Sequence, residues 1–454
     1  MRVCLLNDSF PPQIDGVANT TKNYAEVIQR RFGDATVVVP HFPGAQDDYP
    51  YQVLRYPSFD TSKFCNGYRM GFPFSPETAG TLVDFAPEVI HSHCPFVSTA
   101  MARIVQSQVK APLIFTYHTK FDVDIAKALR FNFLQEPTVK ALVNNIAACN
   151  EVWVVSRGAG ENLRSLGYQG DYRVMENGVE FPSGRVSQAR QDALSAKYQL
   201  PRDGRPLFLF VGRMMWYKNL RLILDALARV KAAGQDFHMV FIGDGQDLPQ
   251  VKDYARQLGL EQNCLFTGAI RDREELRTWY CRGNLFLFAS TYDTNGLVVR
   301  EAAACSLPSL LVQGSCAAEG ISDQHNGLMI EETPESMAAM LLKWSKNLSG
   351  LRQIGENANR EIYLSWDDSV ARAVERYAVV ADNYKAGRYP ESDALLDEFF
   401  DLTGDLLTGL QKAREIRDDM SERFIVKPYR TVKAVNKKVL HKIRENIPIP
   451  PWYK

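Results

Sequence analysis

Residues 284–301, with the sequence NLFLFASTYDTNGLVVRE, combine an apolar strand, a turn and the start of a helix. The run from Asn284 to Ala289 has the length and composition of a buried strand, and Asn295-Gly296 is a turn signal in front of Leu297. A helix that begins at Leu297 has unpaired backbone N–H groups beyond the strand end, which suit phosphate or sugar oxygens. The stretch predicts a strand–turn–helix unit of a parallel sheet, with a ligand site at its edge.

Two carboxylates, Asp293 and Glu301, stand eight residues apart across this turn. A carboxylate beside a diphosphate would repel it, so the useful partner of Glu301 is a pair of neutral hydroxyls, such as a ribose diol. An ordinary helix with a solvated Glu301 is the alternative that this stretch alone leaves open.

A second stretch places two cations at the end of another strand. Residues 207–211, LFLFV, form a continuous apolar run, which Gly212-Arg213 and then Lys218 follow before a helix expected over residues 219–228. Gly212 permits close backbone approach, and the two cations are suited to neutralising a departing diphosphate. Two solvated cations at a helix entrance are the structural alternative.

These two stretches together resemble the retaining glycosyltransferases of GT-B family 4. The resemblance rests on FVGR at residues 210–213, KNL at 218–220 and the acid-x7-Glu pattern of Asp293 and Glu301. Further matches follow in the family's order: NDSFPPQIDGV (7–17), IHSHCPF (90–96), FTYHT (115–119), ENGV (176–179), GDG (243–245) and SWD (365–367). The resemblance covers roughly residues 1–386 and implies an α/β GT-B fold, with two Rossmann-like doubly wound parallel-sheet domains facing a cleft.

Short apolar runs alternate with helical stretches twice along the chain, which agrees with this fold. The expected strands lie at residues 2–7, 35–39, 88–91, 112–117 and 151–155, and then at 207–211, 237–242, 285–289 and 309–312. We expect an acceptor-side domain at 1–185, a nucleotide-sugar-binding domain at 186–365, and a helix at 366–386 that crosses back to the first domain through Trp366 and Tyr377. Residues 390–454 are expected to form a helical extension.

The resemblance also assigns roles at the site. Four residues are expected beside the reacting groups: His118 as a hydrogen-bond partner of the transferred sugar, Arg213 and Lys218 at the leaving diphosphate, and Asp293 beside the sugar. The residues expected to bind the donor are Gly16, Val17, Gly212, Ile270, Asn295, Gly296, Leu297, Val298 and Glu301, with Glu301 on the ribose and Ile270 near the base. The family usually has Glu where this chain has Asp293, so the shorter side chain leaves its sugar contact to water or to backbone N–H groups.

Two metal motifs compete with these assignments. His91-x-His93 places two imidazoles on one face of a strand, and His118 would supply a third zinc ligand, but no fourth ligand is evident. Asp122-x-Asp124 imitates the metal-binding motif of the other major glycosyltransferase fold. Because Arg213 and Lys218 already supply positive charge, we expect no metal and no cofactor, and we interpret the aspartate pair as an acceptor-side loop or a helix start.

Composition excludes several classes. The chain has 454 residues, 45% of them hydrophobic, and a formal net charge of zero, which argues against a general nucleic-acid binder. No run of 18 apolar residues indicates a membrane span, and residues 2–6 enter a strand without a signal region. Eight scattered cysteines without Cys-x-x-Cys spacing indicate reduced thiols. These features predict a cytoplasmic location.

The net charge of the tail changes from negative to positive along its length. Residues 391–420 hold nine acidic and three basic side chains, whereas residues 421–454 hold nine basic and two acidic ones. Between Tyr429 and Ile443 apolar residues recur at helical spacing, and Trp452-Tyr453 follows, as in an interfacial anchor on anionic lipid. The alternative is packing on an acidic helix at 395–410, in the same chain or in the second copy of a homodimer.

The loop at 7–17 and the FTYHT stretch look closest to the branch of the family that glucosylates diacylglycerol in bacterial membranes. We therefore expect a retaining hexosyltransferase, peripherally bound to the inner face of the membrane, that moves glucose or a similar hexose from a UDP-sugar to a lipid hydroxyl. The alternatives are the same chemistry on a soluble saccharide, a GT-B nucleotide-sugar epimerase and a noncatalytic sugar-nucleotide-binding protein. A guanosine donor is also open.

Overall fold

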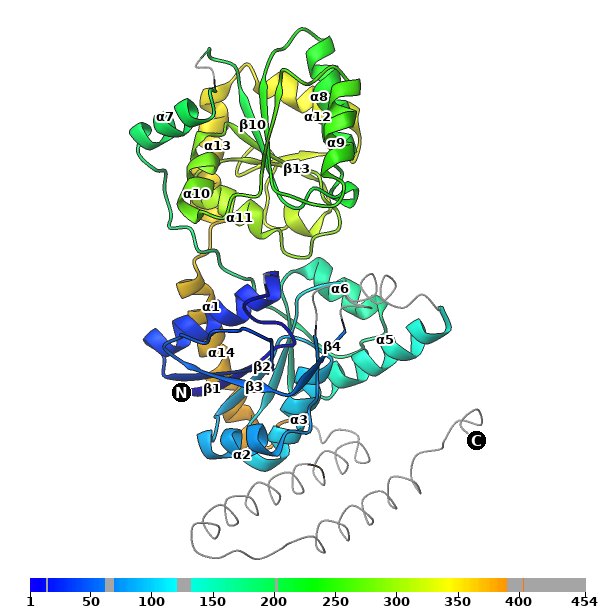
Figure 1. The fold of residues 1–454 in the computed structure, drawn as a ribbon, viewed down its shortest axis with the longest axis vertical. Coiled ribbons are helices and arrows are strands. Elements are labelled where there is room, and N and C mark those ends of the chain that lie inside the picture. The colour runs from blue at the N-terminus through cyan, green and yellow to red at the C-terminus, as the bar shows by residue number, and fades with distance from the viewer. Residues whose placement is uncertain (14, 62–68, 121–131, 201–202, 390–402, 404–454) are drawn as a thin grey trace, which may run out of the picture.

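The computed structural model describes residues 1–13, 15–61, 69–120, 132–200, 203–389 and residue 403, and it shows two α/β lobes stacked along the long axis (Figure 1). The first lobe, blue to cyan in Figure 1, contains the N-terminus, and the second, green to yellow, follows it in sequence. The predicted α/β class with two doubly wound parallel sheets is confirmed. The expected helical extension at 390–454 and the Asp122-x-Asp124 motif lie outside the described residues.

The first lobe is built on a seven-stranded parallel sheet with the order β3-β2-β1-β6-β7-β8-β9. Its strands are β1 (Arg2–Leu6), β2 (Asp34–Pro40), β3 (Gln52–Tyr56), β6 (Val89–Ser92), β7 (Leu113–Tyr117), β8 (Glu151–Val154) and β9 (Arg173–Val174). The crossover helices are α1 (Gly16–Arg31), α2 (Pro76–Phe85), α3 (Val97–Val109), α5 (Asn132–Ala147) and α6 (Arg157–Ser165). A small antiparallel pair, β4 (Ser58–Asp60) and β5 (Arg69–Gly71), forms a separate two-stranded sheet.

The second lobe is built on a six-stranded parallel sheet with the order β12-β11-β10-β13-β14-β15. Its strands are β10 (Leu207–Val211), β11 (His238–Ile242), β12 (Cys264–Gly268), β13 (Leu285–Phe288), β14 (Ser309–Val312) and β15 (Leu328–Ile330). The helices are α7 (Gln188–Lys197), η1 (Trp216–Lys218), α8 (Leu220–Ala232), α9 (Leu248–Gln257), α10 (Arg273–Arg282), α11 (Leu297–Ala304), η2 (Cys316–Ala318), α12 (Pro334–Trp344) and α13 (Leu348–Glu361). The strand order reverses between β10 and β13, and this switch point is where open α/β sheets bind ligands.

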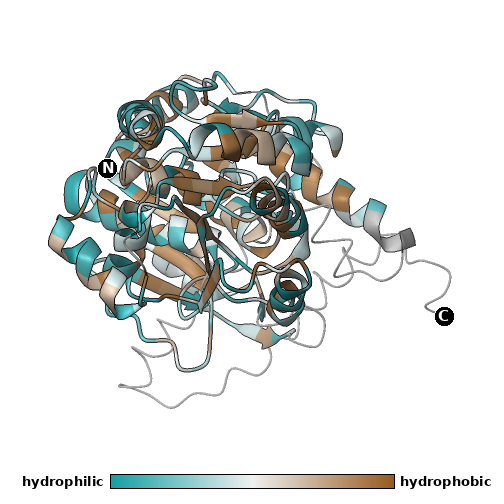
Figure 2. Ribbon diagram, turned by 90° about the horizontal axis from the view of Figure 1, so that it is seen from above, coloured by the Kyte–Doolittle hydropathy of each residue, from teal (hydrophilic) through white to brown (hydrophobic). Residues whose placement is uncertain are grey.

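The central strands are apolar because helices cover both faces of each sheet. All five residues of β10 are buried, as are those of β11. Figure 2 shows the hydrophobic colour concentrated on the inner strands and on the helix faces turned toward them. One large cluster fills the second lobe, and the first lobe divides its core between the two faces of its sheet.

The last described helix, α14 (Trp366–Lys385), returns to the first lobe, where Figure 1 shows it beside α1. Tyr377 is fully buried there, with its ring stacked on Trp153 at 5.3 Å between centroids. Trp366 joins the same cluster. Burial of these aromatic rings anchors the end of the family-like region to the first lobe.

Two segments of chain run side by side between the lobes. The N–H of Val179 donates to Leu364 O at 2.9 Å, and Val179 forms a parallel bridge with Ser365. A Cβ on Gly178 would lie 2.5 Å from the carbonyl carbon of Ser365, so only glycine permits this approach. The ENGV and SWD motifs, almost two hundred residues apart in sequence, thus meet at the crossing.

Several elements were absent from the sequence prediction, namely β3, β9, β12, β15 and the β4–β5 pair. Each is short or mixed in polarity: QVLRY in β3 is only partly buried, β12 is an edge strand of intermediate burial, and β15 has three residues. Strands of this kind lack the continuous apolar run that identifies a central strand. No helix in the described ranges is long and apolar enough to cross a membrane.

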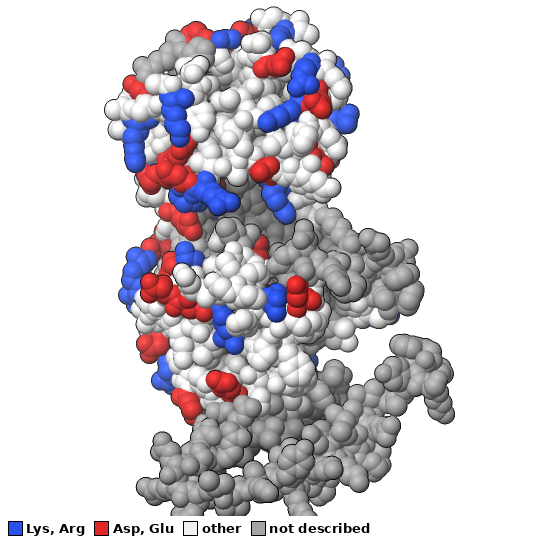
Figure 3. Space-filling model, in the orientation of Figure 1, with Lys and Arg blue, Asp and Glu red and all other residues white. Residues whose placement is uncertain are grey.

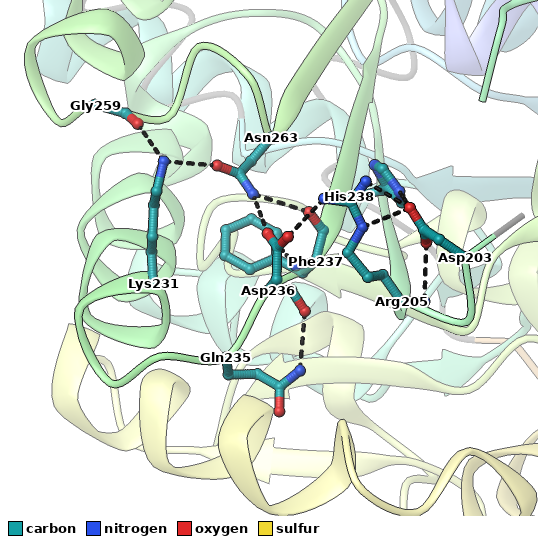
Figure 4. A network of polar contacts seen from close by, with 9 residues as sticks. All are labelled: Asp203, Arg205, Lys231, Gln235, Asp236, Phe237, His238, Gly259 and Asn263. Atoms are coloured by element: carbon teal, nitrogen blue, oxygen red, sulfur yellow. Dashed lines mark hydrogen bonds and ion pairs between the residues drawn. The ribbon is translucent and has the colours of Figure 1, made fainter. Parts of the chain in front are cut away.

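A polar network lies at the amino-terminal ends of β11 and β12 in the second sheet (Figure 4). The side-chain amide of Asn263 donates to the Asp236 carboxylate at 2.8 Å and to Phe237 O at 3.0 Å. Lys231 donates to the Asn263 side-chain oxygen at 2.9 Å, and Arg205 pairs with Asp236 at 2.6 Å. These bonds tie the turns before β11 and β12 together.

Candidate functional site

The loop after β13 contacts the first lobe directly. Thr294 Oγ1 donates to His118 O at 2.5 Å, and Ser156 Oγ donates to Thr294 O at 2.5 Å. Lys120 Nζ lies 3.3 Å from Thr291 O. Figure 3 shows basic and acidic side chains together on the rim of the upper lobe that faces the lower one. This loop, residues 289–296, carries Asp293 and therefore forms part of the interface between the two lobes.

Lys218 and Asp293 form an ion pair at the switch point. Lys218 Nζ lies 2.5 Å and 2.7 Å from the two carboxylate oxygens of Asp293, and the Lys218 side chain is 8% exposed. Burial lowers the pKa of Lys218, Asp293 opposes that shift, and Arg213 adds to it. Asp293 therefore contacts the ammonium group that we expected, from the sequence, to bind the diphosphate. Arg213 lies close enough for its positive charge to lower the pKa of Lys218.

Close backbone contact fixes the loop that carries these cations. The N–H of Gly212 donates to Ile242 O at 3.0 Å, and a Cβ on Gly243, which has φ +137°, would lie 1.9 Å from Gly212 O. Asn219 adopts φ +56° and donates to Ala289 O at 2.9 Å and to Glu332 at 2.6 Å. The ends of β10, β11 and β13 are thus locked together around Lys218.

Glu301 lies on α11 with both carboxylate oxygens bonded. Oε1 accepts from Arg273 at 2.6 Å and Oε2 accepts from Tyr280 Oη at 2.9 Å, and Glu301 is 9% exposed. Burial, with a further contribution from the Glu301 carboxylate, raises the pKa of Tyr280 well above its usual value, which keeps its hydroxyl a donor. A carboxylate has about four acceptor positions, so Glu301 retains capacity for two further hydroxyl donors.

The turn before α11 requires glycine. Gly296 has φ +58°, and a Cβ there would lie 2.9 Å from the Cβ of Ala317. Within the described part of the chain, no side chain caps this helix end, and the buried amide nitrogen of Asn295 has no hydrogen-bond partner. Leu297 and Val298 are half-buried in the first turn. The predicted strand–turn–helix unit is therefore present, with donors at its N-terminal end.

His91, His93 and His118 form one buried group, in which the rings of His91 and His93 pack at 4.1 Å between centroids. His91 bonds Tyr377 Oη and Thr116 Oγ1, each at 2.6 Å, and His93 Nδ1 lies 2.9 Å from His118 Nε2. Burial lowers the pKa of His118 to about 3, and burial with neighbouring histidines lowers those of His91 and His93 well below the usual value. Both nitrogens of His91 are occupied, and the described residues contain no cluster arranged to hold a metal ion.

On the first lobe, Asp15 caps α1. Its Oδ1 accepts from Val17 N at 2.9 Å and from Ala18 N at 2.7 Å, with Gly16 as the first helical residue. The Val17 amide expected to contact diphosphate is therefore bonded to Asp15 in this structure. Ile270 is half-buried against the core of the second lobe after β12.

The structure brings some of the predicted residues together, in two separate groups. Lys218 and Asp293 meet His118 through Thr294, while Glu301 lies with Arg273 and Tyr280 on neighbouring helices. Neither Arg273 nor Tyr280 was predicted from the sequence. The only sequence signal is their seven-residue spacing on α10, which puts both on one helix face.

Two family models match the chain. Residues 14–181 match the model described as Glycosyltransferase Family 4, and residues 192–361 match the model described as Glycosyl transferases group 1. Together they span most of both lobes.

Individual relatives agree in family and differ in substrate. The chain is 26% identical to an alpha-monoglucosyldiacylglycerol synthase of Streptococcus pneumoniae, over 68% of this chain and 70% of the relative. It is 24% identical to a GDP-mannose-dependent alpha-mannosyltransferase of Corynebacterium glutamicum, over 84% and 89% of the two chains.

Among solved structures, Anabaena Alr3699/HepE in complex with UDP superimposes with a TM-score of 0.68 at 16% identity, over 84% of this chain and 100% of that one. This likeness shows the shared fold. Taken with the two family models, it shows that the chain belongs to the GT-B glycosyltransferases, with a family 4 domain followed by a group 1 domain.

Proposed function

We propose that this protein is a retaining hexosyltransferase that moves glucose from a UDP-sugar to the hydroxyl of a membrane lipid such as diacylglycerol. The observation that carries the proposal is the placement of Lys218 beside Asp293 at the switch point, with Thr294 bonded to the His118 backbone across the lobes. Similarity to the Streptococcus pneumoniae synthase and to the UDP-bound Anabaena structure supports the acceptor and the donor base.

In this reaction the diphosphate leaves between the lobes. Arg213, Lys218 and the N-terminal N–H groups of α11 stabilise its growing charge, and Gly212 allows it to approach the backbone. Gly16 and Val17 are assigned to the diphosphate from the first lobe, so Val17 would exchange its bond to Asp15 for a phosphate oxygen. Glu301 holds the ribose diol, and Ile270 lies near the base.

The transferred sugar passes through an oxocarbenium-like transition state. Asp293 and His118 lie beside it, and burial, which lowers the pKa of His118 to about 3, favours a neutral imidazole there. The acceptor hydroxyl attacks the anomeric carbon from the face that the diphosphate leaves, the C–O bond to the diphosphate breaks, and a phosphate oxygen receives the proton. The configuration is therefore retained without a separate base.

We further assign residues 1–185 with the helix at 366–386 to the acceptor side and residues 186–365 to the donor side. The basic segment 421–454 is assigned as an anchor on the inner, anionic membrane surface, and pairing of the tail with a second copy is the other outcome. Both tail assignments rest on the charge pattern of the sequence. Deleting residues 421–454 is expected to abolish sedimentation with anionic liposomes, and undiminished sedimentation would exclude the anchor.

The function is tested with the full chain, UDP-glucose and vesicles that contain diacylglycerol, by following nucleotide release and the anomeric configuration of the glycolipid. An α-linked product from UDP-glucose, whose own linkage is α, is expected. GDP-mannose is the second donor to assay, because the Corynebacterium relative carries that name and spans most of both chains. Transfer only to soluble glycosides would replace the lipid acceptor, epimerised sugar without an acceptor would indicate an epimerase, and no nucleotide release with either donor would reject the proposal.

A further inference from the structure

Arg273 is the first residue of α10, and its guanidinium contacts three side chains. Its Nη2 lies 2.6 Å from Glu301 Oε1, and its Nε lies 3.2 Å from Glu180 Oε2. The guanidinium carbon also lies 4.4 Å from the centroid of the Phe181 ring. An arginine held by two carboxylates and an aromatic face has few rotamers available, so its position is well defined.

Tyr280 completes the arrangement from the same helix. Seven residues after Arg273, it lies on the same face of α10 and is fully buried. Its hydroxyl donates to the second oxygen of Glu301, and its ring packs edge-on to Phe181 at 5.8 Å. Arg273 and Tyr280 therefore hold the Glu301 carboxylate at both oxygens and fix its plane.

Glu180 and Phe181 belong to the segment that connects the lobes. They follow Val179, which pairs with the returning chain at Ser365, and Phe181 is only 3% exposed. Arg277, one turn along α10, binds the same segment through the carbonyls of Pro182 and Gly184, at 3.5 Å and 3.1 Å. Among the described contacts, Arg273 is the arginine that joins this connecting segment to Glu301.

Charge gives Arg273 a second effect. Glu301 is negative and would stand near an anionic nucleotide, and each unit of uncompensated charge at this range costs free energy. The guanidinium neutralises the carboxylate locally while leaving acceptor positions for two hydroxyl groups. The pair is therefore suited to a ribose diol next to a diphosphate.

We propose that Arg273 is a positioning residue that orients Glu301 toward the ribose diol of the donor and is itself held by Glu180 and Phe181 of the connecting segment. This inference rests on the proposed function, because it assigns Glu301 to ribose. Arg273 would thereby link the ribose-binding residue Glu301 to the segment that connects the lobes.

Calorimetric titration of the full chain with UDP and with 2′-deoxy-UDP tests the proposal without an acceptor. We expect the wild type to bind UDP at least about tenfold more tightly than its deoxy analogue, since a site that bonds a hydroxyl loses affinity when the hydroxyl is missing. Arg273→Gln is expected to reduce this ratio to about twofold or less, because Glu301 loses its orientation. Arg273→Lys keeps the positive charge but replaces the planar guanidinium with an ammonium, so it should give an intermediate ratio.

Arg277→Gln is the matched control, since Arg277 binds the connecting segment from the same helix and does not contact Glu301. It should keep the wild-type ratio. Glu180→Gln loosens Arg273 without touching Glu301, so it should lower the ratio about two- to threefold. Circular dichroism and thermal melting establish that each variant is folded before its ratio is compared.

A wild-type ratio in both folded Arg273 variants would overturn the positioning role, and an unchanged ratio in Glu180→Gln would remove the connecting segment from it. If the wild type binds UDP weakly, the same pair of measurements is made with GDP and 2′-deoxy-GDP. Binding of neither ribonucleotide would reject the proposed function itself, which distinguishes the two failures.

Discussion

The ammonium of Lys218 lies within 2.7 Å of both carboxylate oxygens of Asp293, so Asp293, in the loop after β13, already neutralises this buried cation at the switch point. A diphosphate that enters the site meets an ammonium that has a partner and a carboxylate that repels it. Two predictions about binding and rate follow from this pair.

Lys218→Ala is expected to lower kcat by about a hundredfold or more, because the leaving diphosphate loses a buried cation that is worth several kcal/mol in a dry site. Acceptor KM should change far less, since Lys218 stands on the donor side. Steady-state kinetics with UDP-glucose measure both. Lys346→Ala, an exposed lysine in the same lobe, is the control, and unchanged turnover in Lys218→Ala would remove Lys218 from the site.

Asp293→Asn is expected to bind free UDP about tenfold more tightly than the wild type, because the amide no longer competes for Lys218 or repels the diphosphate. Transfer should become slower at the same time, since Asp293 is assigned to the sugar. Calorimetry with UDP and initial-rate assays give the two readings. Weaker UDP binding would contradict competition between Asp293 and the nucleotide. Asp253→Asn, the same change at an exposed position of α9, is the control.

The buried histidines predict that the protein loses stability in mild acid. The pKa of His118 is about 3 in the folded state, against a usual value of 6.5, and those of His91 and His93 are lowered as well. Because the unfolded chain binds more protons between about pH 3 and about 6.5, the free energy of unfolding should fall as pH falls through this window. The slope is at most about 1.4 kcal/mol per pH unit for each histidine.

Urea unfolding at pH 7.0, 6.0 and 5.0 measures this slope, and carboxylates contribute less in that range than below it. His118→Asn removes one titrating group while keeping a polar side chain. The slope should therefore be shallower in this variant. Equal slopes in the two proteins would show that His118 does not contribute.

Asn263→Ala is expected to lower the free energy of unfolding by about 1–3 kcal/mol, because the buried carbonyl oxygen of Phe237 loses a donor and the exposed Asp236 carboxylate loses another. Gln235→Ala is the matched control in the same network (Figure 4), since the side-chain amide of Gln235 donates to Asp236 O at an exposed position. It should change stability by less than about 0.5 kcal/mol. Urea unfolding of both variants measures this difference, provided that the dependence of the unfolding free energy on urea concentration is the same in both. A similar loss of stability in both variants would contradict the role of the network.

The sequence predicted the central strands because their apolar runs are continuous, as in LFLFV of β10. It missed β3, β12 and β15, whose burial depends on neighbours rather than on their own pattern. Among the candidate residues, Lys218 and Glu301 were recognisable because each follows a strand end at a fixed local spacing. Their partners came from distant segments, and no local pattern identifies such partners.

By itself, the sequence determined that two parallel sheets form, where their strands end, and which charged residues follow those ends, since all of these depend on hydrophobic runs and turn residues a few positions apart. Only the tertiary structure decided that Asp293 pairs with Lys218, that Arg273 and Tyr280 hold Glu301, and that Thr294 reaches His118 in the other lobe. Those contacts join residues 21 to 176 positions apart. They depend on how helices pack and how the lobes meet, and this is a property of the whole fold rather than of any local stretch.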